Sequence, residues 1–395
     1  MVAKRKILIA GAGIGGLTAA ACLLRKGFDV QVFEQAPQLG EIGAGIQQSA
    51  NGVKVLYDLG LKDAIEEVAV KPKDYEFRRF DTGELLHKIP FAQAHERDHG
   101  TPYYHLHRAD LHRILAEKVL SLDPGCVKLN SKVLGFAESA HGVTVNFGDG
   151  STATGDVLIG ADGIKSAVRA QIVGETKVTY TGYVAWRLTV PRERLPANTM
   201  DLVGAVWCGP KNHTVLYWLC SGRVLNFVGC PERDAWEDDS WTQRRPWEEL
   251  KAEYAGWHPT IQSILDAADR NECYRWALNN RQPIYNWSTR RATLLGDAAH
   301  PTLPFLAQGA VMAIEDAAVL ARALEGSDAV SDALDLYQRN RVDRTARVVT
   351  ESTAHGGLYH IVDPDEMKRA FASKNVAKER AEWLYCYDPL TVSLR

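Results

Sequence analysis

The residues that point most clearly to chemistry are four glycines near the N-terminus. Gly11, Gly13, Gly15 and Gly16 form the pattern GxGxxG directly after the apolar run Lys6–Ala10. In such a turn the first glycine permits the tight bend, the second lets backbone approach a pyrophosphate, and the last lets the following helix pack on the strand. Phosphates would then lie at a helix N-terminus, which favours anions. The motif therefore predicts a dinucleotide site; glycines that merely close a tight βαβ turn are the alternative.

An acidic residue stands where a ribose would be expected. Glu34 ends a second predicted strand, Asp29–Phe33, about 20 residues beyond the glycine turn, which is the spacing of an acid that binds a ribose hydroxyl. Gln35 follows it directly, and we assign Gln35 to the same cofactor site.

A second candidate site lies on the strand-like segment His213–Tyr217. Alternation places His213, Val215 and Tyr217 on one face. His213 and Tyr217 would be about 13 Å apart at ~3.3 Å per residue, so both could flank one ring-sized ligand. A neutral histidine can accept a proton near pH 7, which suits activation of a phenol. A histidine and tyrosine that only fill the sheet core are the alternative.

Composition excludes several classes of protein. The chain of 395 residues has 46 basic and 49 acidic residues and a net charge of −3, which gives no footprint for nucleic acid. No apolar run is long enough for a membrane span, so we expect no membrane partner.

Cysteines and histidines give no metal or disulfide pattern. The seven cysteines are scattered and lack CxxC spacing, so we expect reduced thiols and a cytoplasmic protein. His105, His107 and His112 have no carboxylate or cysteine at ligand spacing, so we expect no metal site.

The elements that must position these residues follow two patterns of predicted secondary structure. Strand and helix patterns with buried strands occur in both the first and the last parts of the chain, whereas short strands separated by Gly, Pro and Asn dominate the middle. We therefore predict an α/β protein with a discontinuous Rossmann-like nucleotide-binding domain, an inserted, mainly antiparallel β-sheet substrate domain, and C-terminal helices. The predicted division is 1–175 (nucleotide-binding, with a possible substrate-domain segment near 75–105), 176–275 (β-sheet), 276–350 (nucleotide-binding) and 351–395 (helical tail).

Three stretches together carry a family resemblance. They are Gly11–Gly16 with Glu34, then Gly160–Arg169, and finally Gly296–Pro301. In this order and spacing the chain resembles the single-component FAD-dependent aromatic hydroxylases, which have the p-hydroxybenzoate hydroxylase fold and include salicylate, 3-hydroxybenzoate and 6-hydroxynicotinate monooxygenases. The resemblance covers nearly the whole chain.

The resemblance implies roles for four charged residues. Glu34 would bind the adenosine ribose of FAD, Asp297 the ribityl chain, and Arg108 would lie near the flavin. Asp162 matches a segment that contacts both FAD and the nicotinamide cofactor. Each has a plain structural alternative, because Asp162 could cap the next helix, Arg108 could pair with a surface acid, and Asp297 could be an N-cap.

The resemblance also implies residues around the reacting ring. Gly309 and Ala310 would begin a helix whose N–H groups face the flavin, and His213 and Tyr217 match a substrate-binding pair. Gln47 stands where hydroxynicotinate enzymes have a histidine; glutamine cannot take a proton but can orient a ring substituent.

These roles imply an NADH- or NADPH-consuming monooxygenase. By resemblance, it would hydroxylate a small hydroxy- or amino-benzoate or pyridinecarboxylate with dioxygen, through a flavin C4a-hydroperoxide, as a monomer or homodimer. A flavin oxidase or dehydrogenase is one alternative. A non-catalytic binding protein related to guanine-nucleotide dissociation inhibitors is the other.

Overall fold

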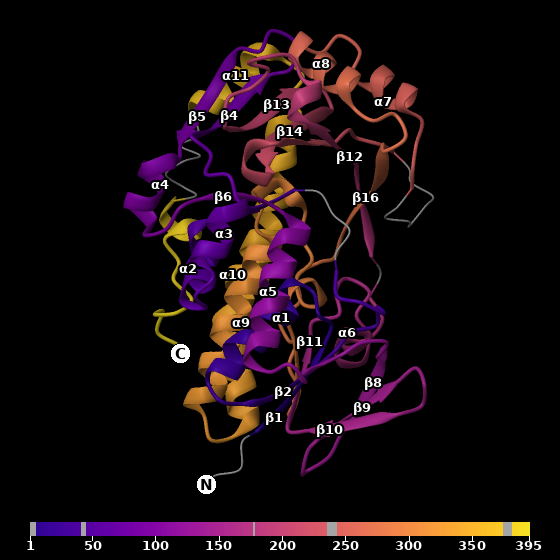
Figure 1. Cartoon of the computed structure of the whole chain (residues 1–395), viewed down its shortest axis with the longest axis vertical. Helices are drawn as coiled ribbons and strands as arrows, with labels where there is room; N and C mark the ends of the chain where they lie inside the picture. The colour runs from indigo at the N-terminus through magenta and orange to yellow at the C-terminus, as the bar shows by residue number, and fades with distance from the viewer. Residues whose placement is uncertain (1–4, 41–44, 177, 235–242, 374–380) are drawn as a thin grey trace.

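The computed structural model describes residues 5–40, 45–176, 178–234, 243–373 and 381–395. It confirms the predicted α/β class, because a parallel sheet lies toward one end of the molecule and a large, mainly antiparallel sheet toward the other (Figure 1). Part of the expected helical tail, residues 374–380, lies outside the described residues, as do residues 235–242 of the predicted β-sheet domain.

The parallel sheet has five strands in the order β17-β11-β1-β2-β7. Apart from Lys6 at the start of β1, the residues of β1 and β11 are apolar and buried, as is typical of strands covered on both faces. Helices α1 (Ile14–Arg25), α5 (Arg108–Leu122) and α9 (Gly309–Gly326) share its core. The strands are β1 (Lys6–Ala10), β2 (Asp29–Phe33), β7 (Val127–Lys128), β11 (Val157–Gly160) and β17 (Ala292–Leu294).

The second large sheet has seven strands in the order β16-β12-β15-β14-β13-β4-β5, antiparallel except for the β13–β4 pair. One face packs against α7 (Trp247–Glu253) and α8 (Pro259–Ala267). The strands are β4 (Asp74–Arg79), β5 (Leu85–Pro90), β12 (Thr179–Pro191), β13 (Gly204–Gly209), β14 (Asn212–Leu219), β15 (Val224–Gly229) and β16 (Tyr274–Asn280).

Smaller elements complete the described chain. Strand β3 (Gly45–Gln48) pairs with β6 (Tyr104–His107), and β8 (Val133–Glu138), β9 (Val143–Phe147) and β10 (Thr152–Gly155) form a three-stranded antiparallel sheet. The shorter helices are α2 (Ala50–Asp58), α3 (Lys62–Val68), α4 (Ala92–His99), α6 (Ala167–Val173) and α11 (Pro364–Ser373), with single turns at Arg192–Arg194, Cys220–Gly222, Gly296–Ala298, Pro304–Leu306 and Ala381–Tyr385.

Helix α10 (Val330–Tyr359) joins the two halves of the molecule. Leu334 and Tyr337 near its start pack in the core of the parallel sheet, whereas Val348 and Tyr359 pack in a core that the seven-stranded sheet shares. In Figure 1, α9 and α10 lie beside the parallel sheet, and α10 extends from there toward the seven-stranded sheet. Strand β16 and helix α10 cross the expected boundaries at residues 275 and 350, and the division into domains stays a prediction.

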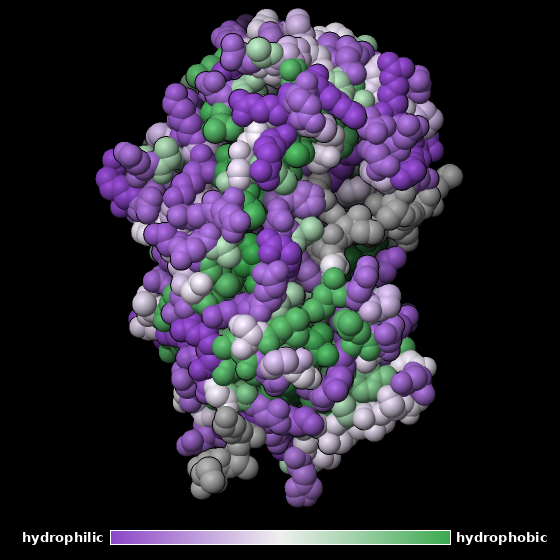
Figure 2. Space-filling view, viewed as in Figure 1, coloured by the Kyte–Doolittle hydropathy of each residue, from purple (hydrophilic) through white to green (hydrophobic). Residues whose placement is uncertain are grey.

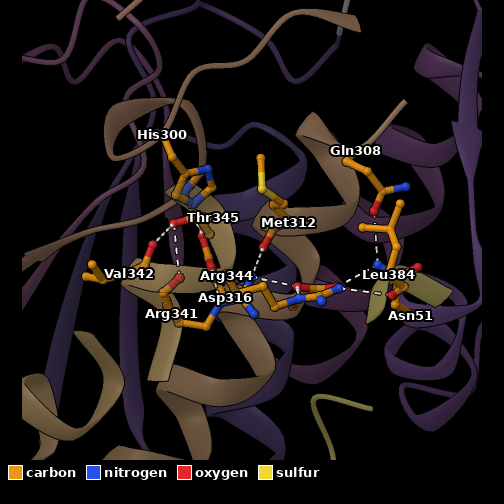
Figure 3. A network of polar contacts seen from close by, with 12 residues as sticks. Asn51, His300, Gln308, Met312, Asp316, Arg341, Val342, Arg344, Thr345 and Leu384 are labelled. Carbon is orange, nitrogen blue, oxygen red and sulfur yellow. Dashed lines mark hydrogen bonds and ion pairs between the residues drawn. The ribbon is translucent and has the colours of Figure 1, made fainter. Parts of the chain in front are cut away.

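Buried ion pairs connect helices α9 and α10 (Figure 3). Arg341 contacts Glu315 and Asp316 at 2.6 Å each, and Arg344 contacts Glu315 at 2.7 Å. Asp316 also accepts from the backbone N–H of Gly296 at 3.1 Å. This charge cluster (Glu315, Asp316, Arg341 and Arg344) therefore fixes the loop after β17 relative to α9.

The surface matches the balanced composition. Hydrophilic residues cover much of the visible face, and hydrophobic residues gather in its lower half, where β11 and α6 lie in the same view (Figure 2). Within the described ranges, no helix combines the length and apolar character needed to cross a membrane. All seven cysteines fall in the described part of the chain, and none forms a disulfide.

Candidate active site

A cavity of about 700 Å³ is lined by residues of both large sheets and of the helices beside them. Every residue predicted for the site lines it except Gly16. These residues are Gly11, Gly13, Gly15, Glu34, Gln35, Gln47, Arg108, Asp162, His213, Tyr217, Asp297, Gly309 and Ala310. Residues far apart in the sequence therefore meet in one space, while their individual roles stay predictions.

The glycine turn has the geometry that the pattern predicts. Gly11 has φ +99°, and a Cβ there would lie 2.5 Å from the carbonyl oxygen of Ala161. A Cβ on Gly16 would lie 2.0 Å from the carbonyl oxygen of Gly11, which explains why Gly16 packs behind the turn instead of facing the cavity. Helix α1 begins at Ile14 with no side-chain cap and no acid in its first turn, so its N–H groups face the cavity unneutralised.

The Glu34 carboxylate stabilises this turn through hydrogen bonds. It accepts from the backbone N–H of Ala12 at 2.8 Å and of Ala36 at 2.9 Å, so the side chain is held at the cavity rim beside Gln35. This position suits the predicted contact with a ribose.

The N-terminus of α9 forms another part of the wall. Gln308 precedes it, and the Gln308 amide bonds Ser49 and Asn51 at 3.0 Å each. The nearest atom to a Cβ on Gly309 would be Thr302 Cγ2, at 3.6 Å, an ordinary contact, so packing does not require glycine there. The missing side chain instead leaves room in the cavity next to the helix N–H groups of Gly309 and Ala310.

The Asp162 carboxylate acts as a helix cap. It accepts from Ser166 Oγ at 2.5 Å and from the backbone N–H groups of Ala167 and Val168 at 2.8 and 3.3 Å. Burial raises the pKa of Asp162, although these hydrogen bonds favour its charged form. The capping alternative thus accounts for its carboxylate; its predicted contact with FAD and nicotinamide stays a prediction.

Asp297 and Arg108 are exposed side chains on the cavity wall. Asp297 lies in the turn Gly296–Ala298 after β17, where Gly296 has φ +62° and is held by Asp316. Arg108 is the first residue of α5. Their exposure leaves both side chains accessible to a ligand in the cavity.

The sheet wall is built by β14. His213, Val215 and Tyr217 line the cavity, whereas Leu216 and Trp218 pack toward α7 and α8, so the predicted alternation is confirmed. Burial raises the pKa of the Tyr217 phenol, which keeps it a proton donor near neutral pH.

His213 is the first member of a hydrogen-bonded chain that the sequence did not reveal. Its Nδ1 lies 2.7 Å from Nε2 of His360, and Nδ1 of His360 lies 2.7 Å from Oε1 of Glu232. His213 Nε2 is buried and has no hydrogen-bond partner among the described residues. Burial, and to a smaller degree the neighbouring His360, lower the pKa of His213 well below its usual value.

Arg187 on β12 was also missed. Its side chain lines the cavity and lies 4.9 Å from the centre of the Trp276 ring, while its Nε has no hydrogen-bond partner in the part of the chain that the structure describes. Burial lowers the pKa of this guanidinium. The signal was a lone arginine within the apolar strand pattern Tyr183–Val190.

Gln47 reaches the cavity from the β3–β6 pair. Tyr103 donates to its Oε1 at 2.6 Å. With the carbonyl oxygen occupied, the N–H groups of the amide are what Gln47 can offer a ligand, which fits the predicted orienting role.

The residues fit FAD. The uncapped N-termini of α1 and α9 both open on the cavity, the glycine turn is too tight for any Cβ at Gly11, and an acid lies at the rim. The turn with Glu34 would hold the adenosine and pyrophosphate portion, and Asp297, Gly309 and Ala310 the remainder.

A family model described as an FAD binding domain matches residues 4–352. The chain is 35% identical over 395 residues to a 3-amino-4-hydroxybenzoate 2-monooxygenase of Streptomyces platensis, with 99% of this chain and 98% of the relative covered. It is 37% identical over 350 residues to a 6-hydroxynicotinate 3-monooxygenase of Pseudomonas fluorescens, covering 87% and 89% of the two chains. A 3-hydroxybenzoate 6-hydroxylase of Polaromonas naphthalenivorans is 37% identical over 384 residues, covering 96% and 95%.

Solved structures give the same picture. Klebsiella pneumoniae HpxO, complexed with FAD and uric acid, superimposes with a TM-score of 0.84 at 29% identity, covering 96% of each chain. A salicylate hydroxylase substrate complex has a TM-score of 0.84 at 26% identity, covering 98% of this chain and 97% of that one. The predicted fold, cofactor and enzyme class are thus confirmed, and the chain belongs to the FAD-dependent aromatic-ring monooxygenases.

Proposed function

We propose that this enzyme hydroxylates a small aromatic carboxylate carrying a hydroxyl or amino group, with NADH or NADPH as reductant and dioxygen as oxidant. The observation that carries the substrate class is Arg187, a half-buried cation on the cavity wall whose Nε is buried and which makes no ion pair with any described residue. A buried cation without a counter-charge is costly, so an anionic ligand group would stabilise it.

The sheet geometry places Arg187 at a distance that suits a ring. Arg187 pairs with Val228 on β15, and Val228 pairs with Val215 on β14, midway between His213 and Tyr217. Two strand spacings correspond to about 10 Å between backbones. An arginine reaching across this width can therefore hold a carboxylate while His213 and Tyr217 hold a substituent on the same ring.

When bound, FAD would supply the redox chemistry that activates dioxygen. His213 Nε2 would accept the proton of the ring hydroxyl, Tyr217 would donate a hydrogen bond to the resulting oxygen, and Gln47 would orient the ring through its N–H groups. Val215, Val228 and Phe305 supply apolar wall that limits water around the ring.

The substrate class is tested by a matched pair of arginines. Arg187 stacks on Trp276 and Arg275 on Trp186, both at 4.9 Å, but Arg275 lies on the other face of the sheet, where it pairs with Glu249. Arg187→Gln should weaken binding of the best benzoate or pyridinecarboxylate by about 10- to 100-fold, the value of a charge-assisted hydrogen bond. Binding of its carboxamide analogue should change little.

Arg275→Gln should bind both ligands as the parent does. A parent that binds carboxylate and carboxamide equally, or an Arg187→Gln variant without loss, would reject a carboxylate substrate. The ligands come from a screen of hydroxy- and amino-substituted benzoates and pyridinecarboxylates for stimulated NADH and NADPH oxidation.

Location and assembly form part of the same proposal. Seven unpaired cysteines favour a reducing compartment, so we place the enzyme in the cytoplasm. A monomer or homodimer is expected, which the molar mass in solution would test.

A further inference from the structure

Three side chains lead from the active-site cavity to the surface. His213 on β14 is fully buried, His360 at the end of α10 is nearly so, and the Glu232 side chain after β15 is 36% exposed. The contacts His213 Nδ1 to His360 Nε2 and His360 Nδ1 to Glu232 Oε1 are both 2.7 Å. The three residues come from separate elements of the fold.

The hydrogen bonds fix which nitrogen carries each proton. A carboxylate can only accept, so Glu232 requires His360 to carry its proton on Nδ1. The Nε2 of a neutral His360 must then accept, which requires His213 to donate from Nδ1. His213 Nε2 is left as a bare acceptor, and it is the atom without a partner.

We propose that His213, His360 and Glu232 form a proton relay that carries the substrate's hydroxyl proton from the active site to solvent. This rests on the proposed function, since it needs a substrate with an ionisable substituent. The hydroxyl proton moves to His213 Nε2, the Nδ1 proton of His213 moves to His360 Nε2, and the Nδ1 proton of His360 moves to Glu232. The substrate becomes an anion, both histidines stay neutral, and Glu232 passes its proton to water.

The surroundings favour transfer over storage of the proton. Tyr183 from β12 and Tyr359 from α10 lie against the two rings, and Phe305 closes the side of His213. Burial lowers the pKa of His213, and it also lowers that of His360 despite the hydrogen bond that His360 donates to Glu232. Among the described groups facing the rings, Glu232 is the acidic one, with the neutral phenol of Tyr183 and the thiol of Cys230 near it.

The orientation of the relay is tested first, without substrate. Nitrogen-15 NMR of histidine-labelled holoenzyme should show both His213 and His360 as neutral tautomers protonated on Nδ1. Each signal is assigned by its loss in His213→Gln or His360→Gln. In Glu232→Gln the amide can donate as well as accept, so His360 should become a mixture of tautomers. Wild-type His213 protonated on Nε2 would overturn the proposal.

Turnover tests the transfer itself. Glutamine at position 360 can hold His213 through its carbonyl oxygen but cannot pass a proton. His360→Gln should therefore lower kcat by about 10²-fold at pH 7, as expected for lost acid–base help, with little change in the KM for the aromatic substrate. Glu232→Gln should lower kcat by about 10-fold. In both variants kcat should recover as pH rises through the hydroxyl pKa of the free substrate, because the substrate then arrives without its proton.

Glu351→Gln is the matched control, since Glu351 has 35% side-chain exposure and its ion pair among the described residues is with Arg347 on the same helix surface. It should keep the wild-type kcat and pH profile. A loss in His360→Gln that stays constant with pH would show a purely structural role and overturn the relay. If no aromatic carboxylate is hydroxylated by the wild type, the proposed function fails, and the NMR result still decides the orientation of the chain.

Discussion

The charge cluster between α9 and α10 and two polar atoms of the cavity wall, Arg187 Nε and His213 Nε2, are all buried, but they differ in how they are paired. In the cluster, each acid meets at least one arginine at 2.6 to 2.7 Å, and Asn51 adds a hydrogen bond to Glu315 at 2.6 Å (Figure 3). On the cavity wall, Arg187 Nε and His213 Nε2 have no hydrogen-bond partner in the described structure.

From this difference we infer that the cluster stabilises the fold, whereas the polar groups of the cavity wall bind a ligand. The cluster positions the loop that carries Asp297 and the N-terminus of α9, and it needs no ligand to do so. The cavity groups are left to be satisfied by what binds there. Substitutions in the cluster should therefore change stability, and substitutions on the wall should change chemistry.

The largest effect is expected in the cluster. Arg341→Met leaves Glu315 and Asp316 buried with fewer counter-charges and should lower the free energy of unfolding by about 3–5 kcal/mol. Denaturant unfolding of the holoenzyme measures this. Arg113→Met, which breaks the exposed pair with Glu117, should cost about 1 kcal/mol or less. Equal losses in the two variants would contradict the structural role of the cluster.

On the cavity wall, substitution of a polar side chain should lower turnover and not stability. Tyr217→Phe or His213→Ala should keep FAD bound and lower hydroxylation by about 10²-fold. The matched control is Tyr254→Phe, because Tyr254 is also fully buried but lies on the opposite face, where it donates to Asn212. It should lose stability and keep its turnover. Unchanged hydroxylation in both wall variants would remove these residues from the reaction.

The two regions should also respond differently to acid. Burial raises the pKa of Asp316, but His300 and Arg341 outweigh it and hold the pKa at about 2, so its stabilisation is lost only as pH falls from about 4 towards 2. Burial lowers the pKa of His105, beside Tyr217, to about 3, so protonation favours unfolding as soon as pH falls below about 6.5.

At pH 5 that single histidine should cost about 2 kcal/mol relative to pH 7. Unfolding free energies measured between pH 7 and 5 should fall, and the slope should be smaller in His105→Asn. The exposed His141→Asn serves as control and should keep the parent slope. A flat profile in the parent would contradict the assignment.

The smallest effect is expected at the N-terminus of α9. Gly309→Ala fills open space beside the cavity and should raise the dissociation constant of FAD several-fold while the unfolding free energy of the apoprotein stays within about 0.5 kcal/mol. Fluorescence titration with FAD measures the dissociation constant, and denaturant unfolding of the apoprotein measures the free energy. Gly326→Ala, at the far end of the same helix and also in open space, should leave FAD affinity unchanged. A stability loss at Gly309 without weaker FAD binding would contradict this.

Local patterns carried much of the prediction. The turn at Gly11, the position of Glu34 after the second strand and the face shared by His213 and Tyr217 follow from spacing within one or two elements, and the sequence predicts them. Arg187, on β12, lines the cavity, whereas His360 and Glu232, after α10 and β15, lie behind His213. Only the sheet order and the length of α10 bring these three residues to their places. A lone histidine at a helix end carries no sequence signal for a relay.

Pairings between strands that are distant in the sequence also leave no local signal. The segment 274–280 has no clear alternation, and its position as the strand beside β12 follows from a non-local pairing. A substrate-domain segment near 75–105 is expected from the sequence, but the parallel pair of β4 with β13, which joins that segment to the same sheet, follows from no local pattern.

The most direct test of the account is a turnover under ¹⁸O₂ with the aromatic carboxylate that best stimulates NADH or NADPH oxidation, followed by mass spectrometry of the product. The account predicts one labelled oxygen atom in a hydroxylated ring, with one nicotinamide oxidised per product formed. Oxidation of the nicotinamide with the aromatic acid recovered unchanged and hydrogen peroxide as the product would contradict it.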